Sequence, residues 1–240
     1  MTGAARSTPA VGATVVIDRA ALDDLLAGIS GQGYQLVGPT VHDGAIVYRD
    51  VRSAGELPIG WGDEQDGGRY RLRRREDEAV FGYAVGPHSW KQFLHPPRLR
   101  LWRAERGENG GGLEFIEESA EVPRYAFFGV RSCELHAIAI QDRVFLPAAN
   151  PDRSYEARRE DVLLVAVNCG EPSGTCFCSS MGTGPKASAG YDLALTEVLE
   201  DGNHRFVVEV GTERGAVVLA GVPHRLAEDA DEHDAAEVTA

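Results

Sequence analysis

Two segments, YAFFGVRSC (125–133) and DVLLVAVNC (161–169), decide the fold of this chain. Each is a continuous run of mostly apolar residues, which is typical of a strand buried on both faces of a parallel sheet. Between them, SCELHAIAIQDRVFL (132–146) has the apolar spacing of a helix. This order predicts a parallel βαβ unit, and such units place functional loops at the carboxyl ends of their strands. Because the strands lead into Cys133 and Cys169, the pairing predicts a site that contains thiols at one edge of the sheet.

Residues 1–120 are predicted to form an α+β region made mainly of antiparallel strands. The segment ATVVIDRAALDDLLAGI (13–29) combines a short strand with an amphipathic helix that Asp18 is placed to cap. From Tyr34 to Glu118, segments separated by glycines carry alternating or β-branched residues, which indicates antiparallel strands. One of these segments, RYRLRRR (69–75), has a basic face that is either solvated or a docking stripe. The residues on this face are Arg69, Arg71 and Arg73.

The remaining chain is predicted to hold an α/β region, 121–222, and an acidic segment, 223–240. YDLALTEVL (191–199) fits the spacing of a strand or a helix, whereas HRFVVEVG (204–211) and AVVLAG (216–221) indicate a closing pair of strands. The acidic, alanine-rich end is typical of a solvated helix or a linker. The expected fold class is therefore α/β (mixed α+β), with a mainly antiparallel N-terminal region before the βαβ-containing region that carries the cysteines.

Composition and charge narrow the possible partners. Over 240 residues, 43% are apolar and 25% are charged, which is ordinary for a globular protein. The net charge of -13 disfavours nucleic acid and anionic membranes as partners and favours a basic protein surface. No apolar run approaches the roughly 18 residues of a membrane span, and the N-terminus lacks the apolar core of a signal peptide. We therefore expect a cytoplasmic chain with no membrane span and no nucleic-acid partner.

The cysteines form the main chemical pattern. The chain has only four, and three of them lie in NCGEPSGTCFCSSMGTGP (168–185), while the fourth is Cys133. Four thiolates at one site suit an iron–sulfur cluster or tetrahedral zinc. The segment lacks the paired Cys-x-x-Cys knuckles of zinc sites, and a disulfide across Cys176 and Cys178 is opposed by geometry and by a reducing cytosol. An iron–sulfur cluster is favoured, with a zinc-stabilised structural or adaptor domain as an alternative.

A thiol-based enzyme that uses Cys133 is a further alternative. Cys133 opens a predicted helix, whose dipole lowers the pKa of a thiol, and His136 follows one turn later. The favoured interpretation of His136 is an ordinary helical histidine without a catalytic role. Lys91 is expected to extend its charged end from a short helix into solvent. Around the cysteines, Arg131 and Lys186 are placed to offset negative charge. Glycines and a serine are expected to offer backbone N–H groups to sulfur, namely Gly170, Gly174, Ser179, Gly182 and Gly184.

Several segments resemble a known family of electron-transfer proteins. Within 125–197 they are FFGVRSCELHAIAIQDRVF, DRSYEARREDVLLVAVNC, and TCFCSSMGTGP followed by GYDLALTE. A weaker similarity lies upstream, in GPHSWKQFLHPP (86–97). They resemble the β subunit of cytoplasmic sulfhydrogenases and the A subunit of anaerobic sulfite reductases, which belong to the 4Fe-4S dicluster group. The resemblance implies one iron–sulfur cluster, of the 4Fe-4S type, with a ligand set of Cys133, Cys169, Cys176 and Cys178.

The same resemblance implies a function and partners. It implies an oxidoreductase subunit that relays electrons between a flavin-containing, nicotinamide-using partner and a catalytic subunit, and that is not a catalyst alone. Members of the family continue into a ferredoxin-like domain with two Cys-x-x-Cys-x-x-Cys-x-x-x-Cys-Pro runs, and this sequence contains no such run. We therefore expect either a fragment or shortened form of such a protein, or a ferredoxin-like module among the partner subunits. The segment 223–240 is expected to be an acidic end or a linker toward such a module.

Overall fold

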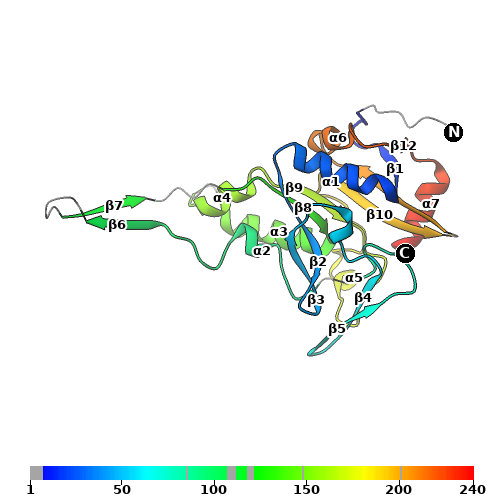
Figure 1. The fold of residues 1–240 in the computed structure, drawn as a ribbon, viewed down its shortest axis with the longest axis horizontal. Helices are drawn as coiled ribbons and strands as arrows, with labels where there is room; N and C mark the ends of the chain where they lie inside the picture. The colour runs from blue at the N-terminus through cyan, green and yellow to red at the C-terminus, as the bar shows by residue number, and fades with distance from the viewer. Residues whose placement is uncertain (1–7, 85, 107–111, 118–121, 148, 201) are drawn as a thin grey trace.

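The computed structural model describes residues 8–84, 86–106, 112–117, 122–147, 149–200 and 202–240. Its centre is an eight-stranded sheet with the strand order β12-β1-β11-β10-β9-β8-β2-β3 (Figure 1). The strands of this sheet are β1 (Thr14–Asp18), β2 (Gln35–His42), β3 (Ala45–Asp50), β8 (Tyr125–Val130), β9 (Leu163–Val167), β10 (Leu193–Glu200), β11 (Asn203–Val210) and β12 (Arg225–Leu226).

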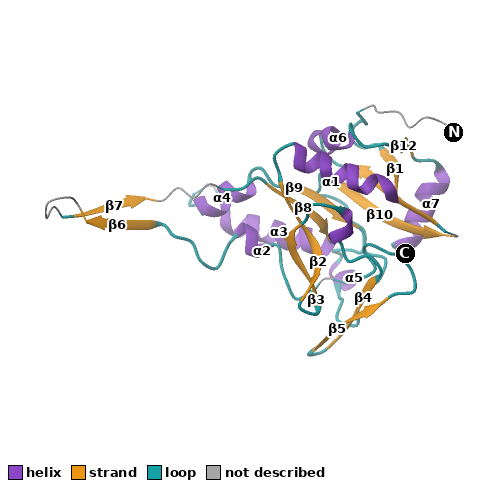
Figure 2. Ribbon diagram, viewed as in Figure 1, coloured by secondary structure: helices purple, strands orange, loops and turns teal. Residues whose placement is uncertain are grey.

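Two separate hairpins and a set of helices complete the described fold. The hairpins are β4 (Trp61–Asp66) with β5 (Arg69–Arg74), and β6 (Trp102–Arg106) with β7 (Leu113–Glu117). The helices are α1 (Leu22–Gly31), α2 (Lys91–Leu94), α3 (Ser132–Phe145), α4 (Arg153–Arg159), α5 (Cys178–Met181), α6 (Glu213–Leu219) and α7 (Asp229–Val238), with 3-10 turns η1 (Arg19–Ala21) and η2 (Ala54–Glu56). Figure 2 shows the β6–β7 hairpin extending away from the rest of the molecule.

The middle of the sheet is parallel and its flanks are antiparallel. Strand β9 pairs in parallel with β8 on one side and with β10 on the other, and β8 pairs in parallel with β2. The neighbouring pairs β2–β3, β10–β11 and β11–β1 are antiparallel. The unit β8–α3–α4–β9 therefore forms the predicted parallel βαβ arrangement, and the mixed α/β fold class is confirmed.

Helices cover both faces of the sheet. On one face, α1 and α6 pack against alternate residues of the central strands, such as Phe128 and Val165. On the other face, α2, α3 and α4 pack against the intervening residues, such as Phe127 and Leu164. The apolar side of α1 is fully buried as predicted, because Leu22 and the residues three, four and seven positions later face the sheet. Among the described residues, no helix is long and apolar enough to cross a membrane.

Three local predictions needed adjustment or correction. YDLALTEVL, whose spacing was ambiguous, forms strand β10, and HRFVVEVG forms β11. The predicted strand in AVVLAG is wrong, because these residues belong mainly to α6, where the Thr212 side chain accepts a hydrogen bond from the N–H of Gly215. Asp18 precedes a 3-10 turn and makes no side-chain capping bond.

The acidic end of the chain is an ordered helix on the sheet. Helix α7 packs through Ala235 and Val238 against a small cluster on the sheet. Its Asp231 is buried and receives the guanidinium of Arg225 at 2.6 Å. The predicted region boundaries, including the one after residue 222, stay predictions. The predicted strand end at Glu118, the boundary between residues 120 and 121, and residues 1–7 lie outside the described residues.

Candidate metal centre

Cys133 and Cys169 lie at the carboxyl ends of two adjacent parallel strands. Cys133 is in the first turn of α3, directly after β8, and Cys169 follows β9 by two residues. Val130 of β8 and Ala166 of β9 are register partners, so both strands finish at the same edge of the sheet. Both thiols are partly buried. The strand pattern in the sequence had predicted this juxtaposition.

Cys176 and Cys178 lie on the loop that follows β9. Cys178 begins the short helix α5, which ends at Gly182 in the left-handed region, with a φ of 63°. Cys178 is partly buried, whereas Cys176 is exposed. The loop returns to the sheet at Pro185, whose carbonyl accepts a hydrogen bond from the N–H of Cys169 at 3.3 Å.

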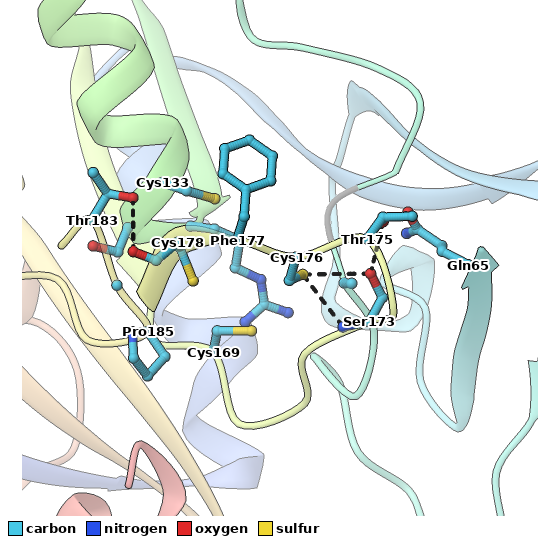
Figure 3. Close-up of a pocket in the computed structure, with 14 residues that line it drawn as sticks. Gln65, Cys133, Cys169, Ser173, Thr175, Cys176, Phe177, Cys178, Thr183 and Pro185 are labelled. Atoms are coloured by element: carbon cyan, nitrogen blue, oxygen red, sulfur yellow. Dashed lines mark hydrogen bonds between the residues drawn. The ribbon is translucent and has the colours of Figure 1, made fainter. Parts of the chain in front are cut away.

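All four cysteines line one cavity of about 180 Å³. Figure 3 shows the four cysteine side chains around this cavity, with the sulfur of Cys176 hydrogen-bonded to Ser173. Within the described part of the chain, no three His, Cys, Asp or Glu side chains form a group that could hold a metal ion. The four predicted residues thus share one cavity, but their side chains are not arranged around a metal ion. Their role as ligands stays a prediction.

Hydrogen bonds orient the sulfurs of Cys176 and Cys169. The N–H of Ser173 donates to Sγ of Cys176 at 3.3 Å, and the Ser173 hydroxyl lies 3.4 Å from the same sulfur. Sγ of Cys169 donates to the carbonyl of Glu171 at 3.5 Å. Among the described residues, the backbone N–H that donates to a sulfur belongs to Ser173, which is not among the glycines and serine predicted for this role. Gly184 matters by its size instead, because a Cβ there would lie 3.3 Å from Sγ of Cys178.

Asn168 supports the strand end that carries Cys169. Its side-chain amide donates to the hydroxyl of Thr196 at 2.8 Å and accepts from the N–H of Ala187 at 2.8 Å. The side chain is buried, so both bonds are shielded from water. Sequence reasoning missed Asn168. Its position directly before a strand-terminal cysteine was the available signal.

Arg131 is buried beside the cavity. It lines the cavity, and its guanidinium donates to the carbonyls of Asn168 at 2.9 Å, Phe81 at 2.7 Å and Tyr83 at 2.8 Å. Lys186, the other predicted cation of this site, behaves differently. Its ammonium group is about half exposed and lies 2.9 Å from the carboxylate of Glu209. Of the two predicted cations, Arg131 is therefore the one at the cavity.

Burial controls the protonation of Cys133. It raises the pKa of the thiol to about 11, with further increases from the charge of Glu134 and from the sulfurs of Cys178 and Cys169. The expected lowering by the helix dipole is outweighed. Burial also raises the pKa of Glu134, which accepts hydrogen bonds from the N–H of Arg131 and the hydroxyl of Tyr48. Cys133 is thus a protonated thiol near neutral pH, which argues against an activated nucleophile.

Other sequence candidates lie away from this chemistry. His136 is exposed on α3, which agrees with the interpretation of an ordinary histidine on a helix surface. Lys91 lies at the start of α2, with Nζ 5.9 Å from the centre of the Phe145 ring. Its charge therefore sits over an aromatic side chain as a snorkelling residue does.

The basic stripe of β5 faces partly acidic neighbours. Arg69, Arg71 and Arg73 are exposed as predicted. In the register of the hairpin, however, Asp66 pairs with Arg69 and Glu64 pairs with Arg71. Residues opposite each other across an antiparallel pair share one face. Carboxylates therefore offset part of the positive charge of this stripe.

The hairpin and the residues after it also tether the cysteine loop. Nη1 of Arg75 lies 2.5 Å from the carboxylate of Glu171, and the same guanidinium binds Asp77 at 2.6 Å. The Thr175 hydroxyl donates to the side-chain oxygen of Gln65 at 3.4 Å. The loop between Cys169 and Cys178 is therefore attached to a second element besides the sheet.

Comparison with known proteins gives one informative similarity. The chain is similar to a sulfhydrogenase subunit. It is 35% identical over 125 residues to Sulfhydrogenase 2 subunit beta of Pyrococcus furiosus, which covers 52% of this chain and 33% of the relative. The chain thus spans about a third of the length of that curated relative. No family model matches the chain, and no solved structure matches it. This similarity supports the sulfhydrogenase part of the predicted resemblance.

Proposed function

We propose that this chain is an iron–sulfur electron-transfer subunit of an oxidoreductase complex. The observation that carries the proposal is the cavity that all four cysteines line at the carboxyl edge of the parallel strands. Ligand sites of α/β sheets lie at this edge. Thiolates are soft ligands, and sets of four of them suit iron–sulfur clusters.

The size of the cavity favours a cluster over a single ion. A cavity needs a volume of only about 10–15 Å³ to hold one water molecule. The cavity has about 180 Å³, which leaves room for a compact group of several atoms between the thiols. The residues that would hold such a group are Cys133, Cys169, Cys176 and Cys178. When bound, a 4Fe-4S cluster supplies reversible one-electron transfer.

The residues around the cavity suit an anionic cofactor. The side chain of Arg131 is 2% exposed and brings a positive charge to the cavity wall. Asn168 anchors the strand end before Cys169, and Ser173 supplies an N–H and a hydroxyl to the sulfur of Cys176. Such bonds to sulfur orient ligands and adjust a cluster's reduction potential. These residues would position and tune the cofactor, and the chain would not be a catalyst alone.

The proposal for the partners rests on the family resemblance. It also rests on the name of the similar protein, Sulfhydrogenase 2 subunit beta, which describes one subunit of a larger enzyme. We propose that electrons pass between a flavin-containing, nicotinamide-using subunit and a catalytic subunit of a hydrogenase or of a sulfite or sulfur reductase. A ferredoxin-like module among the partners would continue the path. The complex would be cytoplasmic. The exposed position of Cys176 supports electron exchange at the protein surface.

Metal analysis of anaerobically purified protein tests this function. We expect about four irons and four acid-labile sulfides per chain, and a broad visible absorbance that dithionite bleaches. Cys176→Ser should lower the iron content, whereas Ser180→Ala, an exposed change in the neighbouring helix α5, should leave it unchanged. One zinc per chain without sulfide would instead assign the cysteines to a structural zinc site. Rapid alkylation of Cys133 alone, with no metal, would support the thiol-enzyme alternative.

A further inference from the structure

Arg131 occupies an unusual position for a charged residue. It follows the last residue of β8 and precedes α3, with its N–H bound to the carboxylate of Glu134 at 2.9 Å. Its side chain is almost completely buried. Burying a guanidinium is costly unless its charge and its donors find partners. The partners of Arg131 are therefore informative.

Neutral carbonyls fix the guanidinium in one orientation. Its terminal nitrogens donate to Asn168, Phe81 and Tyr83, and the group lies 4.9 Å from the centre of the Tyr83 ring. These carbonyls come from two segments that are distant in sequence. The fork shape of the guanidinium allows it to bridge both segments. The side chain is thus held rigidly at the cavity wall.

The positive charge of Arg131 is not neutralised by an ion pair. In the described part of the chain, Arg131 takes part in no ion pair within 4.0 Å, and its Nε has no hydrogen-bond partner. The sulfur of Cys169 and the carboxylate of Glu134 both lie within electrostatic range of the group, but neither forms an ion pair with it. A buried donor without a partner, on a cavity lined by thiols, indicates that an anionic group completes the site.

We infer that Arg131 is the fixed cationic contact of the thiol-bound group and that its charge raises the reduction potential of that group. The inference rests on the proposed function, because it concerns the cluster that the four cysteines would hold. Reduction by dithionite adds one electron, and so one negative charge, to the site. A nearby positive charge stabilises the more negative state. The low dielectric around a buried guanidinium preserves this effect.

Lys186, which does not line the cavity, provides a comparison with a second cation near the cysteine loop. It is also cationic and follows the cysteine loop directly. However, its charge is paired with Glu209 and partly solvated, so salt and water screen it. Removing the charge of Lys186 should therefore change the potential much less than removing that of Arg131.

The test is a potentiometric titration of the cluster in wild-type protein and in Arg131→Gln, Arg131→Lys and Lys186→Gln. We expect Arg131→Gln to shift the reduction equilibrium toward the oxidised form about tenfold, which equals 59 mV for one electron. Arg131→Lys keeps the charge and should lie closer to wild type than the glutamine variant. Lys186→Gln should stay within about twofold, and raising the salt concentration should leave the Arg131→Gln shift in place.

Each other outcome has a defined meaning. An Arg131→Gln variant that holds wild-type iron and has the wild-type potential overturns the inference. If Arg131→Gln fails to fold or to hold iron, the Arg131→Lys variant distinguishes a role of the charge from a role in packing. Iron retention with a near wild-type potential in the lysine variant supports the charge role, and equal failure of both variants assigns Arg131 a packing role and overturns it. Wild-type protein without iron and sulfide overturns the proposed function itself, and the inference with it.

Discussion

The two halves of the thiol site are held by different kinds of structure. Cys133 and Cys169 follow β8 and β9, whose central residues are completely buried in the sheet. Cys176 and Cys178 lie on a loop that is tethered mainly by polar contacts near the surface, such as the ion pair between Arg75 and Glu171. The hydrophobic core therefore positions one half, and a few polar contacts position the other. Changes in the core should affect the whole protein, whereas changes in the loop should act locally.

The same substitution in both halves gives the largest expected contrast. Phe127 is fully buried in β8 and stacks on Trp90 with ring centres 4.7 Å apart, whereas Phe177 is 70% exposed between the two loop cysteines. Phe127→Ala should lower the free energy of unfolding by about 3–5 kcal/mol. Phe177→Ala should change it by less than about 0.5 kcal/mol. Urea denaturation of cluster-free protein measures both values, and similar losses would contradict the division into a core half and a loop half.

Thiol reactivity should separate the halves by pH. In cluster-free protein the pKa of Cys133 is about 11, so its alkylation at pH 8 should be about a hundredfold slower than that of an ordinary thiol. The rate should rise about tenfold per pH unit up to that pKa. Exposed Cys176 is the internal comparison, followed peptide by peptide with mass spectrometry. A Cys133 rate that levels off near pH 8 would contradict the effect of burial.

The same pKa predicts a change in stability with pH. Burial favours the neutral thiol, so the unfolded chain releases this proton at a lower pH than the folded protein does. Between about pH 9 and 11 the folded state therefore binds more protons than the unfolded state. The contribution of Cys133 to stability falls as the pH rises through this range. Cys133→Ser should reduce this part of the pH dependence of unfolding.

Loosening the loop should have the smallest effect on stability. Arg75→Gln removes the ion pairs with Glu171 and Asp77. Because these carboxylates are partly exposed, we expect a loss of only about 0–1 kcal/mol in the free energy of unfolding. Hydrogen exchange of residues 170–177 should nevertheless become faster, while that of β8 and β9 stays unchanged. Arg73→Gln, on the exposed face of β5, is the control and should alter neither quantity.

The core half of the site was predictable because its pattern is local. A continuous apolar run indicates a buried parallel strand, and two such strands end at the same edge of the sheet. This was enough to bring Cys133 and Cys169 together. The short chain between Cys169 and Cys178 then kept the loop cysteines near. The binding role of the four residues depends on chemistry that strand patterns do not carry, and it stays a prediction.

The surroundings of the site depend on contacts that are distant in sequence. Two of the carbonyls that hold Arg131 belong to Phe81 and Tyr83, which lie in the region 34–118 predicted as antiparallel strands. The strand prediction is wrong for residues 79–84, which have no regular secondary structure, so strand periodicity could not indicate these contacts. The error at α6 has a similar origin. Its β-branched residues favour a strand, but the Thr212 cap and the close packing of Gly215 on the carbonyl of Asp192 favour a helix. Tertiary contacts outweighed the local preference.

The position of β1 in the sheet has a consequence for the order of assembly. This strand precedes all the others in the chain, yet its neighbours are β11 and β12, with Thr14 opposite Glu209 and Val15 opposite Leu226. During synthesis on the ribosome, β1 emerges long before either neighbour exists. Pairing over so large a sequence separation is slow. The parallel strands β2, β8 and β9 can associate earlier, so the thiol edge can form before β1 closes the far side of the sheet.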